Sequence, residues 1–168
     1  MVEQSYNFDF TRVDDFFENL NIKFNISDMN KLDSNGDVIG TAQSKFELVL
    51  VSFCSEDISD CLDNTGKIDT SQVTIAKDSS NNDLIQTIGL DWVKGNYGDA
   101  VIQLHNDCTF SIGDVNVPLK GVFLRTNDSN KYVIGYCLNN VAFTVTNQVV
   151  FDSGIIFWDI SRFKSDGE

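Results

Sequence analysis

The sequence predicts an all-β protein, an antiparallel β-sandwich or jelly roll with one short N-terminal helix, and three observations support this fold class. The β-branched residues Val, Ile and Thr are abundant and the chain holds 13 Phe, and such residues favour pleated, half-buried surfaces. From Leu20 onward the period of the apolar residues changes to that of a strand, as residues 22–26 show. Short apolar runs separated by turn residues fill the second half, as in sandwiches and jelly rolls.

The length of 168 residues suits a single domain with one core, so we expect residues 1–168 to fold as one unit. The final residues, 164–168, are polar and include Gly167. They are expected to form a frayed tail.

One helix is predicted over about residues 11–20. Its apolar residues recur at the spacing that places side chains on one face of a helix: Val13, Phe16, Phe17 and Leu20. This face can pack on the parent domain or dock in the groove of a neighbour, and the sequence leaves both possibilities open.

The first half also predicts strands and two surface loops. Residues 22–26 alternate as a strand with one solvated face. Residues 46–53 are apolar on both faces except at two positions, which is typical of a central strand. Residues 54–70 lack periodicity and predict a long surface loop, and residues 78–83 predict a second polar loop after a short strand at 73–75.

The second half predicts a series of short strands separated by turn residues. Residues 128–130 and 139–140 are candidate hairpin turns because Asn, Asp and Ser favour turns. The predicted strands cover residues 100–104, 109–112, 117–124, 131–138, 141–145, 149–151 and 155–160.

The net charge of −13 opposes binding to a phosphate backbone, and no Lys/Arg cluster offsets it. We therefore expect no nucleic-acid partner. No signal segment and no run of membrane-spanning length is visible, so no membrane association is expected either. The four cysteines are Cys54, Cys61, Cys108 and Cys137, and they show no CxxC spacing. They are expected to be reduced, although Cys54 and Cys61 can pair across a loop.

The search for catalytic or metal-binding patterns gives no positive result. His105 is the sole histidine and lies near no nucleophile motif. Asp33, Asn35 and Asp37 alternate in a loop with Gly36, but the glycine is misplaced for an EF-hand and the bidentate Glu is absent. The sequence thus predicts no enzyme, no catalytic residue, no cofactor and no metal.

Residues 117–160 resemble a known family. The similarity lies in Val117–Leu124, in Lys131–Tyr136 and in Phe151–Ile160. These segments resemble the C-terminal strands of small structural proteins of tailed bacteriophages, including the crAss-like group. The resemblance implies a β-sandwich or jelly-roll subunit of the virion, in the capsid decoration, a head fibre or the tail, assembled in the host cytoplasm.

The leading functional hypothesis is accordingly a non-enzymatic virion protein, foremost an auxiliary capsid subunit. Its expected partners are capsid or other virion proteins and further copies of the same chain, because repeated apolar contacts stabilise such assemblies. The residues predicted to form the interface are Val13, Phe16, Phe17, Leu20, Ile155, Phe157 and Trp158.

A second hypothesis, from a different class, is a carbohydrate-binding module or an adhesion component of a fibre or tail. Trp92 and Tyr97 lie near two glycines and can form a platform on which sugar rings stack. Trp158 stands in an apolar run and is predicted to belong to the core or to an interface.

Overall fold

The computed structural model describes residues 11–12, 30–32, 38–40, 46–94, 100–127, 129, 131–152 and 156–159. This part of the chain is mostly antiparallel β-sheet without an α-helix, which confirms the all-β prediction at that level. None of its helices has the length and apolar character to cross a membrane. The strands are β1 (Thr11–Arg12), β2 (Asn30–Leu32), β3 (Val38–Gly40), β4 (Phe46–Phe53), β5 (Thr74–Ile75), β6 (Ile85–Ile88), β7 (Leu90–Lys94), β8 (Ala100–Leu104), β9 (Cys108–Thr126), β10 (Val133–Phe151) and β11 (Ile156–Asp159).

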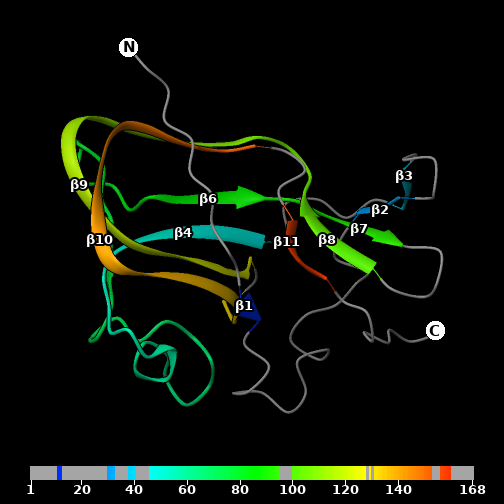
Figure 1. Cartoon of the computed structure of the whole chain (residues 1–168), viewed down its shortest axis with the longest axis horizontal. Helices are drawn as coiled ribbons and strands as arrows, with labels where there is room; N and C mark the ends of the chain where they lie inside the picture. The colour runs from blue at the N-terminus through cyan, green and yellow to red at the C-terminus, as the bar shows by residue number, and fades with distance from the viewer. Residues whose placement is uncertain are drawn as a thin grey trace.

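The strands form two sheets (Figure 1). The first has the order β1-β10-β9-β4-β5, with β6 also paired to β4, and the second has the order β11-β8-β7-β2-β3. The chain passes from β6 to β7 through Gly89 alone, and the carbonyl of Gly89 accepts a hydrogen bond from the backbone N–H of His105 at 3.1 Å. The β2–β7 pair is parallel, whereas the other described strand pairs are antiparallel.

β4 is a central strand, as its sequence predicts. It pairs with β9 on one side and with β5 and β6 on the other. Phe46, Leu48 and Leu50 point into the main core, while Val49 and Val51 point into a second core. Because side chains alternate along a strand, burial on both faces requires a nearly continuous apolar run.

β9 and β10 form one long hairpin instead of the separate short strands predicted for residues 109–151. Figure 1 shows the paired strands curling at the left of the view, with one half along the top and the other beside β4. The register shifts at residues 114–116 of β9 and at residues 139–142 of β10, where extra residues bulge from the ladder. The turn predicted at 139–140 is therefore wrong, because those residues lie within a bulged strand.

The main core is enclosed by β4 and both halves of this hairpin. Phe110 and Phe151 meet edge to face, with their ring centroids 5.8 Å apart. The core also takes in residues of β6, β7 and β8: Ile88, Leu90 and Leu104. A continuous core across both halves explains how one hairpin can remain paired while it bends.

The loop predicted at residues 54–70 exists, but it is not wholly at the surface. It contains a short 3₁₀ helix, η3 (Ile58–Asp60). Its apolar side chains cover the second face of β4 and form the second core together with Val49, Val51, Val73, Phe123 and Val133. The side chains of the loop that take part are Cys54, Ile58, Cys61, Leu62 and Ile68.

The N-terminal helix predicted over about residues 11–20 does not begin at Thr11. Thr11 and Arg12 form β1, which pairs with Tyr136 and Gly135 of β10. The rest of that segment, the strand predicted at 22–26 and the C-terminal tail lie outside the described residues.

Candidate functional site

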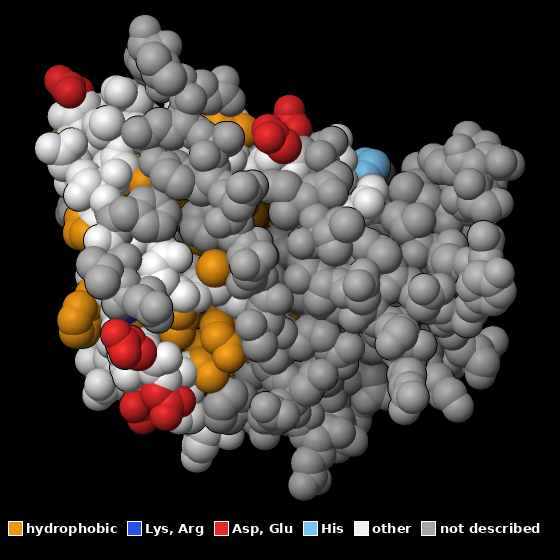
Figure 2. All heavy atoms as spheres, viewed as in Figure 1, with side chains coloured by type: hydrophobic (Ala, Val, Ile, Leu, Met, Phe, Trp, Pro, Cys, Tyr) orange, Lys and Arg blue, Asp and Glu red, His pale blue; other side chains and the backbone are white. Residues whose placement is uncertain are grey.

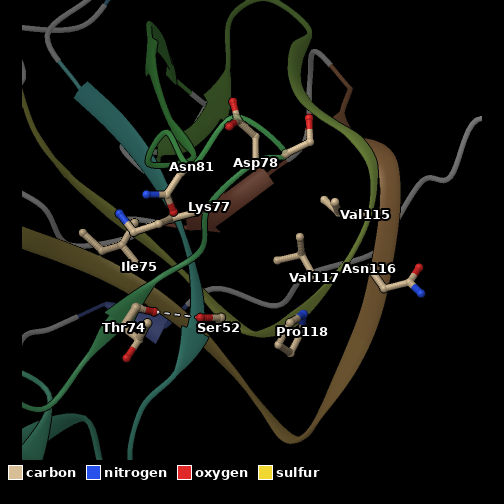
Figure 3. A pocket seen from close by; sticks show the side chains of 11 residues that line it. Ser52, Thr74, Ile75, Lys77, Asp78, Asn81, Val115, Asn116, Val117 and Pro118 are labelled. Carbon is tan, nitrogen blue, oxygen red and sulfur yellow. Dashed lines mark hydrogen bonds between the residues drawn. The ribbon is translucent and has the colours of Figure 1, made fainter.

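A shallow groove of about 400 Å³ lies between β5 with its following turn and the bulge of β9 (Figure 3). It opens at the end of β4, where the main core approaches the surface. The residues that line it are Ser52, Thr74, Ile75, Lys77, Asp78, Ser79, Asn81, Val115, Asn116, Val117 and Pro118.

One wall of the groove is the turn at residues 78–82. The Asp78 carboxylate accepts hydrogen bonds from the backbone N–H groups of Ser80 at 2.8 Å and Asn82 at 2.9 Å. These bonds, that from Asn82 foremost, lower the pKa of Asp78. Asn81 adopts a positive φ of 67°, which Asn tolerates better than most residues. The turn is thus held by its own side chains, in the way that Asp and Asn favour turns.

The turn is fastened to β9 at one point. The backbone N–H of Ser79 donates to the carbonyl of Ile112 at 2.8 Å. The next residue, Gly113, has φ +95°, and a Cβ at that position would lie 2.3 Å from the Ser79 Oγ. Only glycine allows the two chains to approach so closely in this conformation.

The other wall is the bulge of β9. Gly113 pairs with Asn147 and Val117 with Val145, so residues 114–116 stand opposite Thr146 alone. Val117 is buried in the main core, whereas Val115 is 36% exposed. Figure 3 shows Val115, Val117 and Pro118 on the side of the groove opposite the turn. The bulge therefore carries apolar side chains from the core to the rim of the groove.

The groove ends at β4 and β5. The Ser52 hydroxyl donates to the carbonyl of Thr74 at 3.3 Å. The next residue of β4, Phe53, pairs with Thr74 and is 65% exposed. An apolar ring so widely exposed therefore stands one residue from the groove.

The groups that line the groove are suited to binding through hydrogen bonds and apolar contacts. Hydroxyl and amide groups on its rim can donate and accept hydrogen bonds, and valine, isoleucine and proline give it an apolar lining. Its cation, Lys77, forms an ion pair with Asp83. Among the described residues there is no group of three or more His, Cys, Asp or Glu placed to hold a metal ion.

Most residues predicted as an interface or stacking platform lie outside the part of the chain that the structure describes. Tyr97, Ile155 and the four residues of the predicted helix, Val13, Phe16, Phe17 and Leu20, lie outside the described residues. Phe157 and Trp158 lie on β11 and Trp92 lies on β7. Trp92 and Trp158 both pair with Ile102 of β8, so the backbone brings residues from the two hypotheses into one row.

Cys108, near the sole histidine in sequence, is buried in the main core. Burial raises the pKa of Cys108 to about 12. A raised pKa disfavours the thiolate, which is the opposite of the activation that a nucleophilic cysteine needs.

The sequence did not predict the groove. The polar turn at 78–83 was recognisable from its composition, but its partner, the bulge at 114–116, is remote in the chain. No protein-family model matches the chain, and no curated protein or solved structure is significantly similar to it.

Proposed function

We propose that this chain is a non-enzymatic structural subunit that docks on other subunits through the groove and Phe53, hereafter the docking surface. The observation that carries the proposal is the exposure of Phe53 at 65% and of Val115 at 36% beside an apolar-lined groove. Figure 2 shows hydrophobic side chains reaching the surface on the left half of the view. Large apolar side chains that remain exposed at the rim of a groove are candidates for protein contacts.

The rigidity of its supports suits the docking surface to assembly. Its walls are fixed by the Ser79–Ile112 hydrogen bond and by the register of β9 and β10. A surface held in one shape loses little conformational entropy on binding. The polar groups that could act as acid or base, Lys77 and Asp78, are already engaged by Asp83 and by backbone N–H groups.

The proposed assembly is the particle of a tailed phage, foremost as an auxiliary subunit that decorates the capsid. Support comes from the resemblance of residues 117–160, a segment that takes in much of β9, all of β10 and β11. We further propose that the complete fold is a β-sandwich or jelly roll, as the two sheets and the folded-over hairpin favour. The predicted contacts of the N-terminal segment and of β11 remain part of this proposal.

The first experiment is light scattering of the purified chain, together with analysis of purified particles for its presence. We expect a discrete oligomer, a stable complex with particles, or both. Phe53→Asp with Val115→Asp should abolish the association, whereas Thr109→Asp with Ser111→Asp, an equal change of charge at two other exposed strand positions, should leave it intact. A chain that is strictly monomeric and never co-purifies with particles refutes the proposal.

A carbohydrate-binding module is the second candidate, because the backbone register places Trp92 and Trp158 on either side of Ile102. Tryptophan pairs on one sheet can stack on sugar rings. Titration with a panel of glycans tests it through tryptophan fluorescence. A saturable change that Trp92→Ala removes supports this candidate, and an unchanged spectrum across the panel refutes it.

A further inference from the structure

Two buried cysteines meet in the turn that follows β4. Cys54 comes directly after β4 and Cys61 directly after η3, and their residues are 4% and 0% exposed. Both belong to the second core. Each thiol lies close enough to the other to influence its pKa. The Cys61 thiol in turn lies 3.4 Å from the carbonyl oxygen of Ser55 and 3.5 Å from that of Asp57.

The backbone holds the two sulfur atoms together. Asp57 begins η3 and accepts hydrogen bonds from the backbone N–H of Ser59 at 3.0 Å and from its hydroxyl at 2.7 Å. The N–H of Cys61 donates to the carbonyl of Ile58 at 2.9 Å, and the carbonyl of Cys61 accepts from the N–H of Asp69 at 2.9 Å. Both ends of the turn are therefore fixed, and the Cys61 thiol is held beside Ser55, the residue that follows Cys54.

We propose that Cys54 and Cys61 are an oxidation site that forms an intrachain disulfide with a small-molecule disulfide as oxidant. In the reduced state both thiols are free. The thiolate of one cysteine attacks a sulfur of the oxidant, which forms a mixed disulfide and releases one small thiolate. The second cysteine then attacks the protein sulfur of that mixed disulfide and releases the other small thiolate. Two protein thiols are oxidised, one small disulfide is reduced, and its two thiolates take up the two protons.

Opening of the turn controls the reaction. Both sulfur atoms are buried, whereas Glu56, Asp57, Ser59 and Asp60 are exposed and can separate from the protein by local opening. The thiolate is scarce as well, because burial raises the pKa of both cysteines. Oxidation is therefore expected to be slow in the folded protein and faster where the turn opens.

The bond would close the turn into a covalent ring at the end of β4. It would constrain the unfolded chain and so stabilise the folded one. This inference concerns the chain itself and holds whatever the chain assembles with. One consequence rests on the proposed function: a particle subunit that leaves a reducing cytoplasm would be locked after release.

The experiment uses the full chain, incubated with oxidised glutathione or with a reductant, with and without mild urea to open the turn. Free thiols are then blocked with N-ethylmaleimide, and the chain is digested with trypsin. Lys45 and Lys67 flank both cysteines, so residues 46–67 form one peptide. After oxidation we expect this peptide to carry no label and to be about 2 Da lighter than the unlabelled reduced peptide, whereas after reduction it should carry two labels. The oxidised chain should melt roughly 5–10 °C higher than the reduced one.

Single variants supply the controls. Cys54→Ser and Cys61→Ser should each abolish the mass difference and the thermal shift, whereas Cys108→Ala should keep both. The proposal is overturned if the peptide still carries label or glutathione in both urea arms, if either cysteine pairs with Cys108 or Cys137, or if the bond forms without thermal stabilisation. These readouts need no particle or partner, so their failure is distinct from failure of the proposed function.

Discussion

Glu47 is a buried charge inside the central strand. It is 8% exposed, and its Oε1 lies 2.9 Å from the Nε of Arg125 and 3.1 Å from the Nζ of Lys131. Glu47 and Arg125 are register partners in β4 and β9. The one acidic residue of the apolar run is thus matched by a cation on the neighbouring strand. The sequence showed the interruption, but the partner is known only once the strands are paired.

Replacement of Glu47 by Gln should lower the free energy of unfolding by about 3 kcal/mol, because the largely buried Arg125 loses its counter-charge. Urea unfolding measures this loss. Glu56→Gln is the matched control: its carboxylate lies 3.8 Å from Lys120 but is 76% exposed, so a loss under about 0.5 kcal/mol is expected. Equal losses in the two variants would show that the Glu47 pair contributes no more than a surface contact.

Gly113 is the second position where one residue decides local structure. Gly113→Ala should cost about 2 kcal/mol or more, because φ is +95° and the new Cβ would meet the Ser79 Oγ at 2.3 Å. Adding Ser79→Gly should recover part of that loss by removing the contact, while the backbone strain remains. Ser111→Ala, at an exposed position of the same strand, should change stability little. Thermal unfolding of the unchanged protein and these three variants tests the order, and a neutral Gly113→Ala would contradict it.

The buried thiols make stability depend on alkaline pH. Burial raises the pKa of Cys54 and of Cys108 to about 12, with the contact to Cys61 as a smaller cause at Cys54. The unfolded chain loses these protons near its ordinary thiol pKa of about 8.5. Between that pH and about 12 the folded chain therefore binds more protons than the unfolded one. The free energy of unfolding must fall as pH rises through this window.

Unfolding of the reduced protein across this window tests the sign. The urea midpoint should decrease steadily from about pH 8.5 upward. Lysines also titrate in that range, so the double variant Cys54→Ala with Cys108→Ala is the reference, and its decline should be shallower. An identical slope in the two proteins would mean that the thiols do not contribute.

At the scale of elements, the sequence predicted strands well where burial alone defines them. The bounds of β4 agree with the apolar run at 46–53, because both faces of that strand are covered. It failed where the partner strand defines the element. Residues 114–116 and 139–140 resemble turns by composition, yet β9 and β10 continue through them within bulges. A bulge and a turn have similar local chemistry, and only the cross-strand register distinguishes them.

The candidate site was hidden from the sequence for the same reason. The turn at 78–82 was predictable from its Asp and Asn residues. That it faces Val115 follows from one long-range hydrogen bond, between Ser79 and Ile112, which no local pattern encodes. In the same way, only the register of β8 brings Trp92 and Trp158 to Ile102.

The position of β4 between two cores predicts where the fold is most resistant to opening. Amide hydrogen exchange should be slowest in β4 and in the part of β9 paired with it, Gly121–Thr126. It should be much faster in the turn at 78–82, which is held by exposed side chains and a single long-range backbone bond. Mass spectrometry of peptides from these segments provides the comparison. Comparable rates would contradict the central role of β4.

At the scale of the whole molecule, two features act in opposite directions on assembly. The docking surface presents apolar side chains, which attract a partner irrespective of salt. The net charge of −13 makes every copy repel every other. Figure 2 shows acidic side chains at the upper and lower margins of the view, beside the exposed hydrophobic ones. A self-associating subunit must overcome this repulsion, whereas a subunit that docks on a basic neighbour is attracted to it by the same negative charge.

Salt dependence therefore distinguishes the two forms of the proposed function. Repulsion between exposed charges is screened beyond about 10 Å at 0.1 M salt. If copies of this chain bind one another through the docking surface, their affinity should rise between about 0.02 and 0.5 M NaCl. If the chain docks on a basic lattice partner, its affinity should fall over the same range. Sedimentation or light scattering across the series gives the sign.

In either case Phe53→Asp should weaken binding at every salt concentration, because a buried carboxylate then replaces an apolar contact. If the binding affinity changes neither with salt nor in Phe53→Asp, the contact lies elsewhere on the molecule.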